Sequence, residues 1–512
     1  MNQPKIVPRL GIVTKLGYGV GSIASSASAT ALAAGVMTVY LNQVIGLPVA
    51  LVGVAIMISL IFDAIVDPLI GVWSDATRSR WGRRHPFMYA AALPTGFFIY
   101  LLWHTPTSWP KETTFIFVLG LLIAVRFCVG LYDTASAALA PELAPDYNER
   151  TTLMSYRWFF ATAGASVMVM LLYMVFLRRD ANHPLGILNR AGYADFGTVA
   201  AVVISLSILT AGLATHRLIP YLSAPPKPES LKASLKEIAG VLTNPSLLVM
   251  MACGLVGGMG NGITGTMNTY FYLYFWELPP QTTAWLIVVS IPAAFFGATL
   301  TPALSKRFGK KVAMVGLFLV TVVTGLAPMT CRLTGFFPPN GSPWVFVILL
   351  GDAFVTATLG LMGLVLLSSM VADVVEDAAV TTGKRSEGLL FSANNLVPKI
   401  SLAVGGFVAT LLLTAVHFPV HAQQGRVDPS LMRHLALLYL PIVATLGVVA
   451  TLILLLYRID RVKHERNLTD LAARNLAVLP ETLAGGSRSD GELLTGRAPV
   501  APSAEAGRRA AV

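Results

Sequence analysis

The chain has 512 residues, of which 55% are hydrophobic and only 12% are charged, whereas soluble domains carry roughly 25% charged residues. This composition excludes an ordinary soluble protein, because a soluble fold cannot bury so much apolar surface. The net charge of +11 does not indicate nucleic-acid binding, because the basic residues collect in the polar segments between apolar stretches.

The first residues contain prolines and basic side chains, and the apolar stretch after them lacks a small-residue cleavage site. We therefore expect no removable signal peptide. The three cysteines, Cys128, Cys253 and Cys331, have no metal-ligand spacing. We expect them to be packing residues and predict no structural metal.

Apolar stretches recur along the chain, each long enough to cross a hydrocarbon core of roughly 30 Å at 1.5 Å per helical residue. We predict an all-α membrane protein with twelve transmembrane helices in two six-helix bundles. The first six lie at about 16–44, 48–73, 86–104, 113–141, 156–177 and 196–215. The second six lie at about 246–276, 281–304, 312–331, 344–374, 388–418 and 432–457.

These spans divide the chain into four parts. The N-terminal bundle covers 1–215 and the C-terminal bundle 246–457. A linker at 216–245 starts with a proline-rich break and continues with an amphipathic helical period. The tail at 458–512 ends in about 30 residues rich in Gly, Ser, Ala and Pro, which we expect to be disordered.

The basic residues also predict the orientation. With both termini in the cytoplasm, the N-terminus and the cytoplasmic loops together hold 18 Lys and Arg residues and the tail nine more, against seven in the outer loops. By the positive-inside rule we expect a multi-pass protein of the bacterial cytoplasmic (inner) membrane with the N- and C-termini, linker and tail in the cytoplasm. We expect the protein to be embedded in the lipid bilayer as a monomer.

The two halves echo each other. The segment RWGRR at 80–84 recurs as RFGKK at 307–311, an offset of 227 residues. A looser echo relates 141–150 to 373–387. The matched aromatic-glycine-basic-basic order favours an internal duplication, although basic loops also recur simply as topology anchors.

Two acids lie one helical turn apart in the second span. Asp63 and Asp67 are i and i+4, so their carboxylates share one helix face within reach of a small cation. Such residues cost roughly 2.5 to 3.5 kcal/mol at the centre of a span, and they usually mark function or a partner. Sodium suits clustered carboxylate oxygens, and protons are the rival coupling ion because two adjacent like charges favour protonation. Pro68 adds a local helix break next to this pair.

Four more charged residues fall in or at the mouths of spans. Arg126 and Asp133 lie two turns apart in the fourth span, Arg157 opens the fifth, and Lys399 lies inside the eleventh. We expect Lys399 to pair electrostatically with the Asp63, Asp67 and Asp133 group, since snorkelling does not explain its depth. The alternative for Arg126 and Arg157 is a structural ion pair between helices.

Charged residues at the cytoplasmic helix ends form a predicted gate. The loop after the second span combines acid and base, and such loops pair with acids at neighbouring helix ends to close the inner face; a plain topology anchor is the competing interpretation. The gating residues that we predict are Asp75, Arg83, Arg84, Glu142, Arg150, Asp373 and Arg385.

Four segments carry a family resemblance: KLGYGVG, FDAIVDPLIGVWSDATRSRWGRRHP, YDTASAALAPELAPDYNERTTLMSYRWFF and MVADVVEDAAVTTGKRSEGLLFSANNLVPK. Together they resemble the melibiose permease-like glycoside-pentoside-hexuronide:cation symporter family of the major facilitator superfamily, from about residue 15 to 457. The resemblance implies a major-facilitator fold and assigns Asp63 and Asp67 to the cation site. It places Lys399 near that site and matches Asp133 and Arg157 to substrate-contacting positions.

The full predicted substrate-binding set is Asp133, Arg157, Lys399, Arg126, Asn395 and Ser26. The chain departs from the family's pattern at three positions. Ser26 stands where a sugar-binding aspartate is expected, and Ala137 and Leu364 stand where stacking aromatics are expected. These departures predict a more apolar cavity than a sugar pocket.

We therefore predict a sodium- or proton-coupled symporter of a sugar or glycoside that works by alternating access and needs no cofactor. One alternative keeps the scaffold but moves an amphipathic solute such as a lysolipid, steroid or aromatic glycoside. Another is a membrane enzyme or receptor. The sequence argues against that last class, because it shows no metal cluster, nucleophile elbow or phosphate-binding loop.

Overall fold

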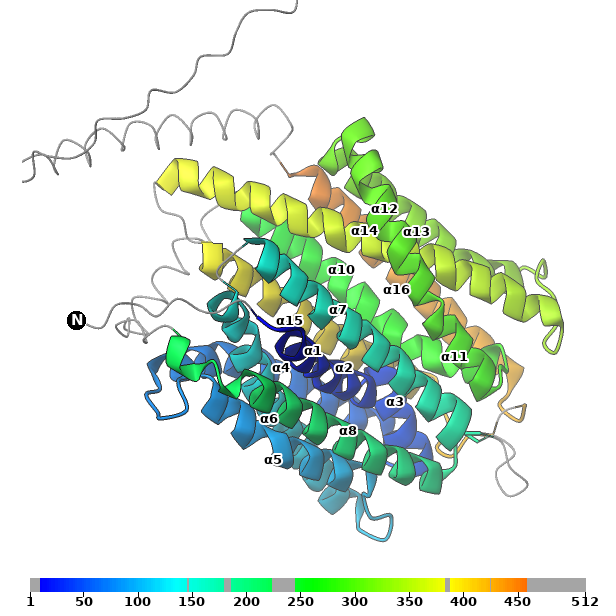
Figure 1. The fold of residues 1–512 in the computed structure, drawn as a ribbon. Coiled ribbons are helices and arrows are strands. Elements are labelled where there is room, and N and C mark those ends of the chain that lie inside the picture. Colours follow the sequence, from blue (N-terminus) through cyan, green and yellow to red (C-terminus); the bar gives the residue numbers. More distant parts are fainter. Residues whose placement is uncertain are drawn as a thin grey trace, which may run out of the picture.

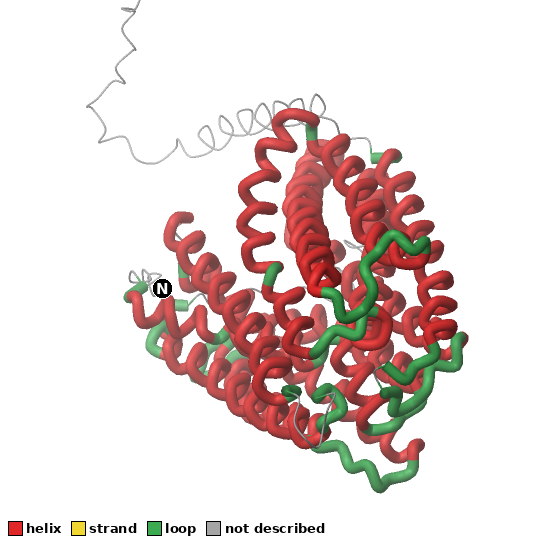
Figure 2. The backbone as a smooth tube through the Cα atoms, turned by 90° about the vertical axis from the view of Figure 1, so that its right-hand side faces the viewer, coloured by secondary structure: helices red, strands yellow, loops and turns green. Residues whose placement is uncertain are grey.

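Helices account for all the regular structure that the computed structural model describes (Figures 1 and 2). The described residues are 10–144, 147–178, 186–222, 245–382, 387–423 and 425–457. The predicted all-α class is confirmed over these ranges.

The N-terminal half supplies six spans. The first span is made of α1 Ile12–Val20, α2 Ser22–Ala31, α3 Ala34–Val39 and the π-helical turn η1 Tyr40–Val44. The next three are α4 Val49–Ala76, α5 His85–Trp103 and α6 Lys111–Leu143. The last two are α7 Tyr147–Met170 with the π-helical η2 Leu171–Phe176, and α8 Arg190–His216, which is followed by the short 3-10 helix η3 Ile219–Tyr221. The first span is bent by 43° between Ala31 and Ala34. The segments α1 to η1 together make one crossing.

The C-terminal half repeats this plan. Its helices are α10 Pro245–Tyr270 with the π-helical η4 Phe271–Phe275, α11 Pro280–Val288, α12 Ser290–Phe308, α13 Lys310–Leu333, α14 Pro343–Thr382, α15 Glu387–Ala415 and α16 Pro429–Leu455. The eighth span consists of α11 and α12, which meet at Val289.

Within the described residues, eleven helices are long and apolar enough to cross a membrane, and the bent first span makes the twelfth. The predicted count of twelve is therefore confirmed. The predicted bounds differ from the observed ones by only a few residues at most ends. The larger differences lie where polar residues extend a helix beyond the bilayer, as in α14, which runs on to Thr382.

Two predicted segments fall mostly outside the described residues. Residues 223–244 contain the amphipathic part of the linker, and residues 458–512 form the tail. The four-part division of the chain stays a prediction.

The helices pack into two bundles (Figure 1). In the N-terminal half, α4 and α5 both pack on α6, α5 packs on α8, and α2 packs on α7 and α8. In the C-terminal half, α10 packs on α15 and α16, α14 on α12 and α13, and α13 on α16. The bundles meet where α4 packs on α15, α3 on α10, and α7 with η2 on α11.

The ends of the first and seventh spans have the same backbone design. In η1 the Ile45 amide donates to the carbonyl of Tyr40 (3.0 Å), and in η4 the Trp276 amide donates to that of Phe271 (2.8 Å). Each turn is followed by a residue at positive φ, Gly46 at 86° and Glu277 at 52°. A non-glycine residue there is uncommon, so this shared geometry supports the internal duplication.

Because twelve spans alternate in direction, the loops fall on two faces. We call the face that holds residue 10, residue 457 and the loop 77–84 the terminal face, and the other the opposite face. Between described residues, the ion pairs at the terminal face all stay within one half. Hydrogen bonds between described residues also join the halves at the opposite face, as between Tyr270 and Asn42.

Candidate cation and solute site

A lysine and two aspartates from opposite halves meet deep within the spans. The Nζ of Lys399 on α15 lies 2.7 Å from Oδ2 of Asp63 and also bonds Oδ2 of Asp67, both on α4. The side chain of Asp63 is 9% exposed, against 31% for Asp67 and 33% for Lys399. The structure thus brings together the two predicted cation ligands and the predicted lysine, with one ammonium shared between the two acids.

Small residues and prolines shape this meeting point. A Cβ at Gly53 would overlap the side chain of Thr410, so glycine permits the close approach of α4 and α15. A Cβ at Gly130 of α6 would lie 2.8 Å from Oδ1 of Asp67. Pro68 and Pro398 each lie inside a helix beside a charged member of the site. Each proline has no N–H, so a carbonyl oxygen one turn earlier is left without its usual donor.

Arg126 belongs to this group. It lies close enough on α6 to interact electrostatically with both Asp63 and Asp67, and its Nε is buried without a hydrogen-bond partner. We predicted Arg126 and Lys399 as substrate-binding residues, and the structure places both beside the predicted cation ligands. Two acids and two bases make the group electrically neutral as it stands.

Asp133 lies in a second polar group formed by the first, fourth and fifth spans. Its Oδ1 accepts a short hydrogen bond from the Ser25 hydroxyl. Arg157 donates to the Tyr18 hydroxyl at 2.9 Å and stacks over the same ring at 5.4 Å, while Tyr18 donates to the Ser136 carbonyl at 2.6 Å. The charges of Asp133 and Arg157 also interact. The two predicted residues are therefore neighbours.

Lys399 does not bond Asp133, although we predicted one group with all three acids. The acid interacts with Lys399 and Asp67 only through longer-range electrostatics, and its hydrogen bond comes from Ser25. The two polar groups are adjacent and electrostatically coupled.

The predicted Ser26 has a different environment from its neighbour. Its hydroxyl donates to the Ile23 carbonyl at 3.1 Å, and a Cβ at Gly164 would lie 2.8 Å from its Oγ. Ser26 therefore packs on the fifth span, whereas Ser25 bonds Asp133. Sequence reasoning missed Ser25 and Tyr18, because adjacent helical residues point about 100° apart and only packing decides which of them faces the site. The side chain of Asn395 lies outside those that the structure describes.

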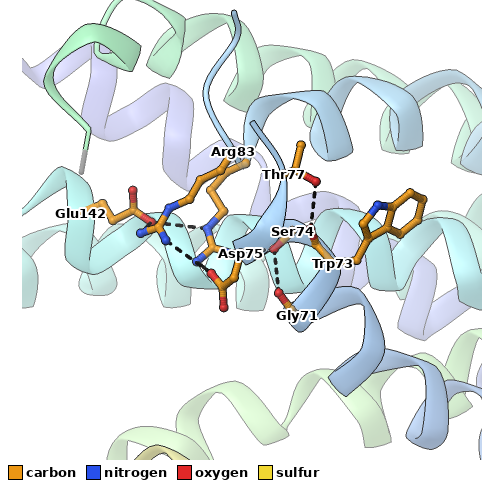
Figure 3. A network of polar contacts seen from close by, with 8 residues as sticks. Gly71, Trp73, Ser74, Asp75, Thr77, Arg83 and Glu142 are labelled. Carbon is orange, nitrogen blue, oxygen red and sulfur yellow. Dashed lines mark hydrogen bonds and ion pairs between the residues drawn. The ribbon is translucent and has the colours of Figure 1, made fainter. Parts of the chain in front are cut away.

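Four of the five predicted gating residues of the N-terminal half form one network at the terminal face (Figure 3). Glu142 at the end of α6 accepts from Arg83 at 2.8 Å and from Arg84 at 3.3 Å. Asp75 accepts from Arg84, which also bonds the Ser74 hydroxyl. The side chains of Arg84 and Glu142 are 6% and 8% exposed. This network ties the loop after α4 to α6.

The C-terminal half contains the matching pair. Lys310 lies 227 residues after Arg83, and its Nζ bonds both carboxylate oxygens of Asp373, at 2.7 and 2.8 Å. Arg150 donates to the Ala144 carbonyl at 3.2 Å. Arg385 lies outside the described residues. The pairs between described gating residues thus connect helices within a half.

An amide that we did not predict joins the halves at the opposite face. The Gln43 side chain, 1% exposed, donates to the Pro419 carbonyl at 3.1 Å and accepts from the Ala422 amide at 2.7 Å. Its backbone carbonyl lies 2.6 Å from Nδ1 of His421. We call these contacts between the end of the first span and the loop before α16 the Gln43 clasp. A neutral, polar residue at a helix end carries no sequence signal for such a role.

Comparison with known proteins agrees with this arrangement. The model of the "MFS/sugar transport protein" family matches residues 17–461. The putative glycoside/cation symporter YagG of Escherichia coli is 26% identical, with 80% of this chain and 84% of that protein covered. The inner membrane symporter YicJ of Escherichia coli is 27% identical, with 78% and 81% covered. An uncharacterized symporter of Synechocystis sp., sll1374, is 26% identical, with 82% and 88% covered.

Solved structures of transporters share the fold. The nucleoside transporter NupG superposes with a TM-score of 0.60 at 14% identity, over 86% of this chain and 98% of that one. The inward open xylose transporter XylE from Escherichia coli gives a TM-score of 0.55 at 15% identity, over 87% and 96%. The predicted major-facilitator fold is confirmed by these likenesses.

Proposed function

The chain belongs to the MFS/sugar transport protein family, and on that premise we propose that it is a secondary active symporter that couples the entry of a monovalent cation to the transport of a sugar or glycoside. The family consists of membrane transporters, so the enzyme alternative falls away. Alternating access between the two bundles exposes one central site to each face in turn.

The single observation that carries the proposal is the ammonium of Lys399 shared by Asp63 and Asp67. Two acids with one lysine and Arg126 are neutral without a cation. When Na⁺ or H⁺ binds the carboxylates, it takes the place of the ammonium, and the contact between α4 and α15 loosens. Because α4 and α15 belong to different halves, binding of the cation changes the contact that holds the bundles together.

The second polar group supplies the solute site of the N-terminal half. Asp133 and Arg157 offer an acceptor and a donor for hydroxyl groups, and Asp133 interacts electrostatically with Asp67 and Lys399 of the adjacent cation site. Relatives are named as an isoprimeverose transporter and a lactose permease, which supports a sugar or glycoside as cargo. Neither of these two names points to an amphipathic solute.

The orientation follows from charge. The terminal face carries the basic loops, so we place it, with both termini, on the cytoplasmic side of the bacterial inner membrane. The opposite face is then the outer one. The Gln43 clasp joins the halves at that face, which supports an inward-facing conformation, and one chain contains both bundles, as a functional monomer requires.

The test is gradient-driven uptake into liposomes. Purified protein is reconstituted and supplied with radiolabelled lactose, isoprimeverose or sulfoquinovose under an imposed inward Na⁺ gradient, H⁺ gradient or neither. We expect accumulation of at least one of these sugars with one of the two gradients. Asp67→Asn should abolish it, whereas Asp195→Asn, at an exposed position near the opposite-face end of α8, should not.

Two results would overturn the proposal. One is the absence of gradient-driven accumulation of any of the sugars by the wild-type protein. The other is undiminished cation-dependent accumulation by a correctly inserted Asp67→Asn variant, which would remove the carboxylate pair from the coupling mechanism.

A further inference from the structure

Asp352 is a carboxylate within the tenth span that belongs neither to the cation site nor to the polar group around Asp133. It is partly buried on α14, and no basic residue in the described part of the chain lies within ion-pair distance of it. The deep acids of the N-terminal half differ in this respect, since Asp63 and Asp67 share Lys399 and Asp133 interacts with Arg157. A carboxylate deep in a span without a cation is costly and usually marks function.

Two tyrosines and a threonine lie near this carboxylate. Tyr272 and Tyr439 both lie close enough to interact electrostatically with it. Thr356, one turn further along α14, has its hydroxyl beside the carboxylate but makes no well-formed hydrogen bond with a described group. Tyr439 is held in place by Thr264, with 3.1 Å between the two hydroxyl oxygens. Tyr272, Thr356 and Tyr439 belong to the seventh, tenth and twelfth spans.

Tyr272 belongs to a polar stripe along the seventh span. Asn261, Asn268 and Tyr272 are spaced by seven and four residues and therefore share one helix face. Asn261 is exposed, and a Cβ at Gly265 between them would meet no atom within 4 Å. Amide side chains in the body of a span face an interior space and not lipid. Tyr272 also interacts with Tyr173 of the N-terminal half, so the stripe reaches the boundary between the bundles.

Asp352 and the cation site lie at different depths in their spans. It lies nine residues after the start of α14 at Pro343, or about 13 Å into the span. Asp63 lies 14 residues after the start of α4 at Val49, or about 21 Å. Both helices start at the opposite face, so Asp352 lies about 8 Å nearer to that face.

We propose that Asp352, with Tyr272 beside it, is the solute-binding group of the C-terminal half and accepts hydrogen bonds from hydroxyl groups of the sugar. This inference rests on the proposed function and names the specificity determinant of its site. A carboxylate accepts from two hydroxyls at once, and a tyrosine ring provides the flat apolar surface that the face of a sugar covers. The chain has Ser26 where its family has a sugar-binding aspartate, and Asp352 would supply the missing carboxylate. It has Ala137 and Leu364 where the family has stacking aromatics, and Tyr272 would supply the missing ring.

The experiment measures how the initial rate of uptake depends on the sugar concentration and on the cation gradient. Asp352→Asn, Asp352→Ala, Tyr272→Phe and the control Asp195→Asn are reconstituted in liposomes, and initial rates are recorded for lactose, isoprimeverose and sulfoquinovose together with their monodeoxy derivatives. We expect KM for the transported sugar to rise roughly ten- to hundredfold in Asp352→Asn, with its cation dependence retained. One monodeoxy derivative should be a poor substrate of the wild type and lose nothing further in Asp352→Asn.

The outcomes separate this inference from the proposed function. If the wild type accumulates none of the sugars, the proposed function fails, whatever Asp352 does. If the wild type accumulates a sugar and Asp352→Asn has an unchanged KM for it, the inference alone fails. It also fails if Asp352→Asn keeps its KM for downhill uptake but loses accumulation, because Asp352 would then be a proton site. Thermal unfolding of each variant checks folding, and Asp352→Ala, for which KM should also rise, gives a second test if Asp352→Asn is unstable. Tyr272→Phe keeps the ring and should change KM less than Asp352→Asn.

Discussion

Lys399 donates to Asp63 across 2.7 Å although 336 residues separate them in the chain, and the same ammonium bonds Asp67. This contact joins the two bundles at the level of the proposed cation site. Because its three members come from both halves, an ion bound at this site would act on both halves at once.

Removing the lysine should make stability depend on the cation. Lys399→Gln leaves two carboxylates with only Arg126 nearby, and breaking a buried ion pair costs about 3 kcal/mol, the low end of the usual range, because Lys399 is 33% exposed. We expect a lower melting temperature without added cation and a larger upward shift on adding Na⁺ than in the wild type. The measurement is thermal unfolding in detergent at several Na⁺ concentrations and pH values.

A compensating change provides the control for that prediction. The double variant Lys399→Gln with Asp67→Asn restores one acid for one base, so it should regain most of the lost stability without regaining transport. A double variant no more stable than Lys399→Gln would show that charge balance is not what Lys399 contributes.

Neighbouring serines in α2 should have unequal effects on transport. Ser25→Ala removes the hydrogen bond to Asp133, and hydrogen bonds to charged groups contribute roughly 1.5 to 3 kcal/mol. We expect KM for the transported sugar to rise about tenfold or more. Ser26→Ala removes only a local bond to the Ile23 carbonyl and should change KM less than about twofold. Equal effects of the two variants would exclude Ser25 as the residue that positions Asp133.

Loss of the Gln43 clasp should open the opposite face. Gln43→Ala removes two side-chain hydrogen bonds to the loop before α16, at about 1 kcal/mol each. The equilibrium between inward- and outward-facing states should then shift roughly 30-fold toward outward-facing. Spin-label distances across the opposite face report the populations. Gln423→Ala, in the same loop but exposed, should leave them unchanged.

The two equivalent ion pairs at the terminal face should differ in strength. Glu142→Gln leaves two guanidinium groups without their acid, and Arg84 is only 6% exposed. Asp373→Asn leaves Lys310, whose side chain is 30% exposed and hydrated. We therefore expect Glu142→Gln to lower the free energy of unfolding by about 3 kcal/mol and Asp373→Asn by clearly less. Unfolding in increasing denaturant measures both, and a larger loss at Asp373 would contradict the prediction.

The sequence alone determined the number of spans, their class and most of their ends. Span length and hydropathy act within one helix, because lipid requires each crossing to satisfy its own backbone hydrogen bonds. The spacing of Asp63 and Asp67 likewise places them on one face without knowledge of any neighbour. The depth of Lys399 in its span predicted a partner for the same local reason.

Only the tertiary structure decided which groups meet. It selected Ser25 over Ser26, placed the hydrogen bond of Asp133 on Ser25 and not on Lys399, kept the terminal-face pairs between described residues inside each half, and revealed the Gln43 clasp and the tyrosines near Asp352. Each of these depends on how one helix is rotated and set against another. Helix rotation and crossing follow from the fit of many side chains at once, and no single segment of the sequence contains that information.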